Sequence, residues 1–441
     1  MERGIKREFF RYVSSNILGM IGLSCYILAD TYFIATKMGS NGLTSLNLAI
    51  AIYSFIHGLG LMIGIGSATK FSICRSQGQT EKANETFTSA VILGIACGAV
   101  LVVTGIVGAE KLACILGARG EIVPMTTVYL RTILCFSPCF LLNNVFLAFV
   151  RNDKAPQLAM VGMVAGSLAN IVMDYLFIFP MDLGMFGAAL ATGAAPVISL
   201  CILSLHKIKK RNQFHFCRKL VSAAEMIQCC MLGISAFLNE ISSGVVLIVF
   251  NLLILRLEGN VGVAAYGIVV NLALVAISVF TGISQGMQPM VSRFYGSGQT
   301  EKARKIYQYA TVLSIFFGVL FVLITFGYAE PLVAVFNSEG YQSMAEMAKE
   351  GLRIYFTGFL FVGVNIVTAS YLAAVEKAGK SFQISIFRGT IGILDFALVL
   401  SSLFQMKGVW LAFPCTEAAT VILSCLSMRR GSARGRQKIE K

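Results

Sequence analysis

The sequence predicts an all-α integral membrane protein with twelve transmembrane helices in two six-helix bundles, related as parallel repeats and with both termini cytoplasmic. Low charge, long apolar runs and an internal repeat lead to this prediction. Of the 441 residues, 56% are hydrophobic and only 13% are charged, and the mean hydropathy is +0.76. Because soluble proteins carry about a quarter charged residues, a soluble enzyme, a disordered chain and a collagen-like fibre are excluded.

Twelve apolar runs are each long enough to cross a bilayer as a helix, which needs about 20 mainly apolar residues. Strands of a membrane barrel would be about 10 residues long with alternating polarity, so helices are expected. The first run follows a basic N-terminus, as in a signal peptide, but it is too long and lacks a small-residue cleavage site. The expected spans are 14–36, 46–69, 88–108, 127–149, 158–179, 185–206, 229–255, 264–287, 308–327, 349–374, 381–403 and 408–428.

The basic residues indicate the orientation, because lysine and arginine gather in cytoplasmic loops. With the N-terminus placed in the cytoplasm, 27 of the 36 basic residues fall on the cytoplasmic side and 8 on the other, with Arg388 inside a span. The net charge of +14 is therefore an orientation signal, and no nucleic-acid partner is expected. Most of the 12 cysteines lie in apolar runs, where free thiols behave as small hydrophobic groups, so we expect no metal site and no cofactor.

The two halves of the chain are related by an internal repeat. The segment Gly78-Gln-Thr-Glu-Lys-Ala83 recurs 220 residues later as Gly298-Gln-Thr-Glu-Lys-Ala303, each copy between two apolar runs. Weaker matches at nearly the same offset pair Gly42 with Gly262 and Asp174 with Asp395. Because each half holds an even number of spans, both insert in the same direction. The expected domains are a first lobe 1–206, a basic linker 207–222, a second lobe 223–428 and a basic tail 429–441.

The repeated loop itself has a structural interpretation. Its glycine is expected to end one helix, and its threonine, Thr80 or Thr300, is expected to be the N-cap of the next. A direct role in gating is the alternative.

Ionisable side chains inside the spans are functional candidates, because a charge at mid-bilayer costs about 2.5–3.5 kcal/mol on insertion scales. Asp30 and Asp174 lie at similar distances from the outer ends of their spans, so both are expected at one depth. Asn170, one turn before Asp174, and Thr192 on the next span reach a similar level. Such oxygen ligands suit a hard cation like sodium, and two close carboxylates also make a proton acceptor. The alternative is a structural hydrogen bond between helices.

The second half carries a different set of charged residues: Glu240, Arg388, Asp395 and Glu417. Arg388 and Asp395 are about two turns apart and are expected to share a helix face. A buried ion pair, between these two or with Glu240 or Glu417, is at least as well supported as an independent cation site.

Three stretches resemble the multidrug and toxic compound extrusion (MATE) family, and together with the repeated loops the resemblance spans nearly the whole chain. It implies two six-helix lobes facing a central cavity, with alternating access to the two sides of the membrane. It also implies export of amphipathic, often cationic, compounds in exchange for protons or sodium. The stretches are Tyr26-Ile-Leu-Ala-Asp30-Thr-Tyr-Phe-Ile34, Asn170-Ile-Val-Met-Asp174-Tyr-Leu-Phe-Ile178 and Gly184-Met-Phe-Gly-Ala-Ala-Leu-Ala-Thr192.

The resemblance also implies roles for individual residues. Glu240 falls where some members of the family carry an acidic residue in span 7. Many relatives have prolines in span 1 and early in span 7, whereas residues 14–29 contain none and span 7 begins Gly233-Ile-Ser235. This departure puts in question a coupling mechanism that requires a proline bend in span 1. The cation site of the first lobe would be lined by Asp30, Asn170, Asp174 and Thr192, with Tyr26 beside it.

The leading prediction is a secondary active efflux carrier of the cell membrane, a monomer that exports small, amphipathic, cationic molecules by antiport with protons or sodium. The alternative is a lipid-linked saccharide flippase of the same superfamily. Its pyrophosphate ligand would need a cationic cavity, but away from their ends the spans hold essentially one arginine, Arg388, and five acids. An enzyme is not expected, because the sequence contains no HExxH motif. Direct ATP drive is not expected either, because no Walker-type nucleotide-binding loop is present.

Overall fold

The structure is a computed structural model that describes residues 2–335 and 341–437, with side chains described over 3–335 and 341–429. Within these ranges the regular elements are all helices. The first half contains α1 (Glu2–Ser76), α2 (Thr80–Ile115), α3 (Ile122–Cys135), α4 (Ser137–Asn152), α5 (Pro156–Ile178) and α6 (Gly184–Ile208). The second half contains α7 (Ala223–Gly296), α8 (Thr300–Ala334), α9 (Gln342–Phe356), α10 (Phe359–Ala374), α11 (Ala378–Ile386), the π-helix η1 (Phe387–Ile391) and α12 (Gly392–Gln437).

The expected twelve spans follow from breaks and bends in these helices. Over the described residues, seven helical stretches are long and apolar enough to cross a membrane, or nine if the bent pairs α3–α4 (48°) and α9–α10 (46°) each count as one span. Four of the seven stretches contain a residue with non-helical backbone angles: Gly39, Gly259 and Gln405 each divide a stretch into two long segments, whereas Tyr328 lies near the end of α8. The three divided stretches therefore contribute two segments each, and the predicted helical fold with two repeats is confirmed.

The duplication is visible in the backbone. Gly39 (φ 62°, ψ −151°) and Gly259 (φ 64°, ψ −153°) break α1 and α7 in the same way, 220 residues apart. Positive φ is a conformation that glycine adopts at little steric cost. Gly78 and Gly298 have positive φ just after α1 and α7 end, as expected. The expected threonine caps are wrong, because Gln79 and Gln299 occupy the N-cap positions without side-chain capping bonds, and Thr80 and Thr300 are the first helical residues.

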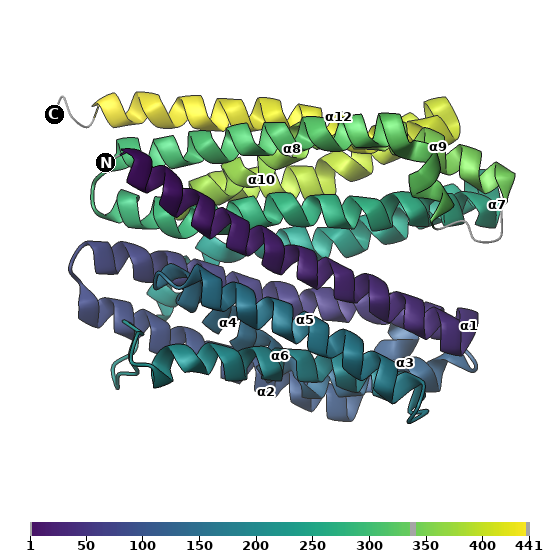
Figure 1. Cartoon of the computed structure of the whole chain (residues 1–441), viewed down its shortest axis with the longest axis horizontal. Coiled ribbons are helices and arrows are strands. Elements are labelled where there is room, and N and C mark those ends of the chain that lie inside the picture. Colours follow the sequence, from purple (N-terminus) through teal and green to yellow (C-terminus); the bar gives the residue numbers. More distant parts are fainter. Residues whose placement is uncertain (1, 336–340, 438–441) are drawn as a thin grey trace.

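The helices form two lobes, with the first part of α1 crossing from one lobe to the other (Figure 1). Phe9, Tyr12 and Val13 of α1 are buried in the core of the second lobe. From Ile34 onward, α1 packs in the core of the first lobe, which Met226 near the start of α7 also contacts. Each lobe therefore packs against the first helix of the other lobe. The domain boundaries inferred from the sequence stay a prediction.

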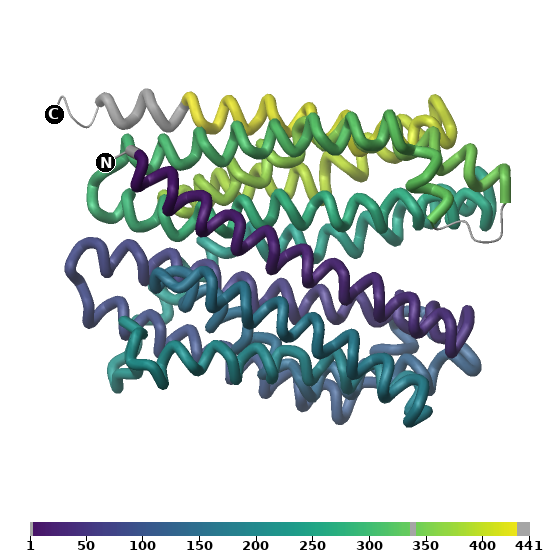
Figure 2. Tube along the Cα trace, viewed as in Figure 1, coloured from purple at the N-terminus to yellow at the C-terminus, as the bar shows by residue number. Residues whose placement is uncertain are grey.

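The start of α1 and the later part of α12 lie at the same end of the bundle, where the α1–α2 and α7–α8 turns also lie (Figure 2). The segment between α6 and α7 is anchored at this end, because Arg75 donates to the backbone oxygen of Gln213 (2.8 Å) and Phe214 is buried in the first core. The cytoplasmic placement of this end stays a prediction. The backbone of the expected basic tail continues α12 to residue 437, and its last four residues lie outside the described residues.

The lobes pack closely at this same end. A Cβ on Gly66 would overlap the carbonyl oxygen of Cys229, and a Cβ on Gly286 would lie 2.7 Å from the Cα of Val13. Arg293 forms two bonds of 2.9 Å to the Glu8 carboxylate. Further along α7 a Cβ on Gly244 would meet no atom within 4 Å. The lobes thus meet backbone to backbone at the end that carries the termini.

Candidate functional site

Helices α1 and α5 bring the two acidic candidates of the first lobe together. A side chain at Gly22 would contact Ser167, and about three turns later the ring of Phe33 packs on the aromatic side chains at the end of α5. This register places Asp30 beside Asp174. Asp30 is 6% exposed and Asp174 is 0% exposed, and the two carboxylates interact electrostatically. In the described part of the chain neither forms an ion pair with a basic side chain.

Asn170 and Thr192 belong to the same buried cluster. The surrounding donors and acceptors assign the Asn170 amide so that its nitrogen donates to Asp174 Oδ2 (3.1 Å) and its oxygen accepts from the Thr192 backbone N–H (3.2 Å). The remaining oxygens Asp30 Oδ1, Asp174 Oδ1 and Thr192 Oγ1 are buried without a hydrogen-bond partner. Unpartnered buried oxygens are costly, and a bound proton or hard cation would satisfy them.

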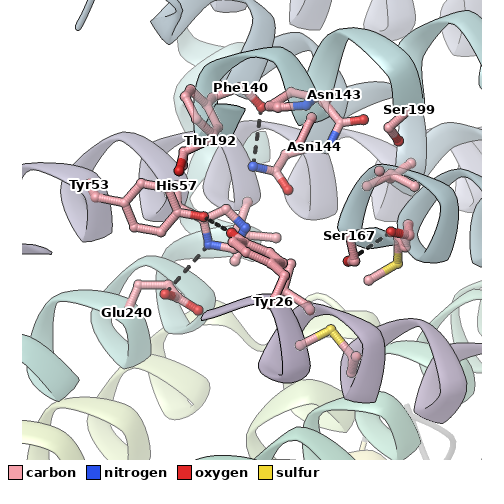
Figure 3. Close-up of a pocket in the computed structure, with 18 of the residues that line it drawn as sticks. Tyr26, Tyr53, His57, Phe140, Asn143, Asn144, Ser167, Thr192, Ser199 and Glu240 are labelled. Carbon is pink, nitrogen blue, oxygen red and sulfur yellow. Dashed lines mark hydrogen bonds and ion pairs between the residues drawn. The ribbon is translucent and has the colours of Figure 1, made fainter. Parts of the chain in front are cut away.

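Tyr26 connects this cluster to a cavity. Its hydroxyl lies 2.6 Å from the hydroxyl of Tyr53, and Tyr26 and Thr192 both line one cavity (Figure 3). Asp30, Asn170 and Asp174 are not part of the cavity wall. The candidate cation site therefore lies in the first lobe next to the cavity, with Tyr26 and Thr192 between them.

The cavity reaches the second lobe at Glu240. The Tyr53 and His57 rings stack at 5.9 Å, and His57 Nδ1 lies 3.5 Å from Glu240 Oε2 (Figure 3). Glu240, Gln285 and Leu61 also line a second cavity, whose other walls come from α7, α10 and Arg388. The two cavities thus adjoin at Glu240, which is a charged group shared by both.

The charged residues of the second lobe form an ion pair. Arg388 Nε lies 2.5 Å from Glu417 Oε1, and Asn365 donates to Glu417 Oε2 at 2.8 Å. Asp395 is exposed and does not join them. The expected shared face of Arg388 and Asp395 is wrong, because the π-helix η1 at Phe387–Ile391 widens one turn. One residue corresponds to about 100° of helix rotation, so the residues after the wide turn face another direction.

Several residues of the cavity wall were outside the sequence prediction. Tyr53 and His57 lie one turn apart on α1, and Asn144 lies on α4. Arg151, which the charge pattern assigns to a cytoplasmic connection, is only 3% exposed. A polar face on an apolar helix is the signal that could have identified Tyr53 and His57. The burial of Arg151 depends on packing between distant helices and has no local signal.

These features define a polytopic helical membrane protein, built from two duplicated lobes around a cavity. The family model MatE matches residues 16–176 and 236–394, one segment in each half. The chain belongs to the MatE family.

Individual relatives extend over nearly the same length. The chain is 27% identical over 417 residues to the multidrug export protein MepA of Staphylococcus aureus (strain MRSA252), covering 93% of this chain and 90% of MepA. It is 26% identical over 397 residues to MepA of Staphylococcus saprophyticus, covering 89% and 86%.

Solved structures show the same fold. A crystal structure of MATE in complex with MaL6 superposes with a TM-score of 0.92 at 22% identity, covering 98% of this chain and 97% of that chain. An outward-facing conformation of a multidrug resistance MATE family transporter gives 0.90 at 22% identity, covering 97% and 96%. At this identity the likeness concerns the fold alone.

Proposed function

We propose that the protein is a secondary active efflux transporter, which exports amphipathic small molecules by antiport with protons or sodium through alternating access. The observation that carries the proposal is the buried pair Asp30 and Asp174, two acids without a basic partner in the described chain, beside a cavity between two lobes. The names of the MepA relatives support multidrug export. The protein would act as a monomer in the bacterial cell membrane.

The coupling ion would bind at Asp30, Asn170, Asp174 and Thr192, with Tyr26 at the cavity side. The unpartnered oxygens of this cluster support binding of one cation. Neutralising the two carboxylates changes the electrostatic cost of packing α1 against α5. Because α1 crosses between the lobes, a change in its packing would bias the lobes between the two access states.

Glu240 supports a cationic group on the substrate. Its carboxylate is 33% exposed in the side chain and faces both cavities, and its ion partner is a histidine at 3.5 Å. The aromatic rings of Tyr26, Tyr53 and Phe140 line the same space and suit the apolar part of an amphipathic molecule.

The test is dye efflux from cells that carry Asp174→Asn, with Asp395→Asn as the matched control. The two aspartates occupy corresponding positions of the repeat, but one is buried and the other exposed. We expect Asp174→Asn to abolish energised efflux at unchanged protein levels in the membrane, and Asp395→Asn to keep it. Normal efflux by Asp174→Asn would refute the proposed coupling site.

A further inference from the structure

The basic linker between the lobes, residues 207–222, is fixed on the first lobe, although residues 209–222 form neither helix nor strand. Phe214 is buried in the core of the first lobe. Three backbone N–H groups of the linker donate to side chains of α2: His215 to Asn84 Oδ1 (3.0 Å), Cys217 to Thr88 Oγ1 (3.1 Å) and Val221 to Ser89 Oγ (3.1 Å). The linker therefore keeps one side against the lobe and presents its other side to the surroundings.

The outward side of the linker carries positive charge that the protein does not neutralise. Residues 207–222 contain six basic residues and no acidic residue. Lys219 Nζ lies 3.4 Å from Glu85 Oε1, and Lys207 Nζ lies 5.2 Å from the centre of the Phe216 ring. The other four are exposed and have no acidic partner within the described ranges: Lys209, Lys210, Arg211 and Arg218.

Large apolar side chains are exposed between these basic residues, at Ile208, Phe216 and Leu220. The exposed apolar surface of the helices begins at the same level. Ile92 of α2 is exposed and lies three residues, about 4.5 Å at 1.5 Å per residue, beyond Ser89, to which the linker is bonded. The linker therefore lies where the apolar surface of the bundle begins, which is the headgroup level of a bilayer.

We propose that the basic linker binds the phosphate groups of anionic phospholipids, with Ile208, Phe216 and Leu220 against the glycerol and the first part of the acyl chains. Clusters of about four to eight lysines and arginines next to a transmembrane helix attract anionic lipids. A linker whose backbone is already fixed loses little freedom when it binds. A water-soluble polyanion would satisfy the charges but would leave the three apolar side chains in water. The inference concerns a surface outside both cavities and does not depend on the transported compound or on the coupling ion.

The experiment measures lipid binding to the purified full-length protein in detergent by native mass spectrometry. The probes are dioleoyl phosphatidylglycerol and dioleoyl phosphatidylcholine, which have the same acyl chains but differ in the net charge of the headgroup. We expect the wild-type protein to bind phosphatidylglycerol more tightly. Each basic residue near an anionic surface contributes about fivefold in affinity. The variant Lys209→Gln with Lys210→Gln and Arg211→Gln should therefore lose at least about tenfold of this preference.

Two controls separate the linker from net charge and from folding. The variant Lys209→Arg with Lys210→Arg and Arg211→Lys keeps the charges and should keep the preference. The matched control changes three exposed basic residues at the opposite end of the bundle to glutamine and should also keep it: Lys111, Arg119 and Arg256. A loss in this control as large as in the linker variant would overturn the inference, because net charge alone would then explain the preference.

Equal binding of the two lipids by the wild-type protein, or an undiminished preference in the glutamine variant of the linker, would overturn the inference as well. Glycerol 3-phosphate carries a phosphate without acyl chains and should bind much more weakly than phosphatidylglycerol. If it bound equally tightly, the surface would be a site for a water-soluble anion, and the assignment to lipid would be wrong.

Discussion

The two halves share one fold but bury their charged groups at different places. In the first lobe Asp30 and Asp174 are buried and have no basic partner among the residues that the structure describes. Their counterparts by the repeat, at offsets of 220 and 221 residues, are Phe250, which is fully buried, and Asp395, which is exposed. The second lobe therefore has no acidic pair at the position where the first lobe concentrates its carboxylates.

In the second lobe, by contrast, the buried charged groups are paired with each other. There Asn365, Arg388 and Glu417 form a hydrogen-bonded ion pair. The offset of 221 residues relates them to neutral residues of the first lobe, all of which line the first cavity: Asn144, Ser167 and Pro196. Divergence after duplication thus left two acids without a basic partner among the described residues of one lobe, and an acid paired with an arginine in the other. The comparison favours the first lobe for ion coupling.

The largest effect on stability is expected from breaking the second lobe's ion pair. Glu417→Ala leaves the Arg388 guanidinium buried without its carboxylate and should lower the free energy of unfolding by about 3–5 kcal/mol. The double variant Arg388→Met with Glu417→Leu removes both charges and should recover most of that loss. Denaturant unfolding in detergent micelles measures both. Equal losses of stability in the single and double variants would show that the ion pair does not stabilise this region.

A smaller loss of stability is expected at two close contacts between the lobes that are related by the repeat. Gly66→Ala and Gly286→Ala add a methyl group against the other lobe's first helix and should each cost about 1–3 kcal/mol. The two glycines are related by the repeat, so similar losses are expected. Gly244→Ala is the control, since its methyl group would meet no atom within 4 Å. Thermal unfolding of the purified variants measures the effect, and a loss at Gly244 as large as at Gly66 would contradict the packing argument.

Neutralising an acid of the first lobe should not lower the free energy of unfolding, in contrast to Glu417→Ala in the second lobe. Asp30→Asn removes a buried charge that has no basic partner, so stability should stay constant or rise by about 1 kcal/mol, while energised efflux is lost. Unfolding and efflux are measured on the same preparation. A destabilisation as large as that of Glu417→Ala would mean that the Asp30 carboxylate is a structural group, and the contrast between the lobes would fail.

The smallest effect is expected for an ion pair between the lobes at the surface. Lys70 Nζ lies 2.7 Å from Glu376 Oε1, with side chains 26% and 34% exposed. Because water and salt screen such pairs, a double-mutant cycle of Lys70→Ala and Glu376→Ala should give a coupling energy below about 1 kcal/mol. A coupling above that range would mean that surface charge, and not the backbone contact at Gly66, holds this end closed.

Much of the fold was predictable because its signals are local. Apolar runs define the spans, and one repeated loop reveals the duplication. Counting residues from the span ends also placed Asp30 and Asp174 at one depth, and the structure brings them into one cluster. The exposed position of Asp395 could not be predicted in the same way. The π-helix at 387–391 rotates the residues that follow it, and the hydropathy pattern contains no signal for a π-helix. The burial of Arg151 results from contacts among α1, α4 and α7, which a single sequence does not reveal.

The central claim is that the first lobe's acids couple substrate export to an ion gradient. The most direct measurement is dye transport in proteoliposomes under separately imposed sodium and proton gradients, for the wild-type protein and for Asp174→Asn. We predict transport that depends on one of the two gradients in the wild type and that loses this dependence in the variant. Wild-type transport that depends on neither gradient would contradict the account.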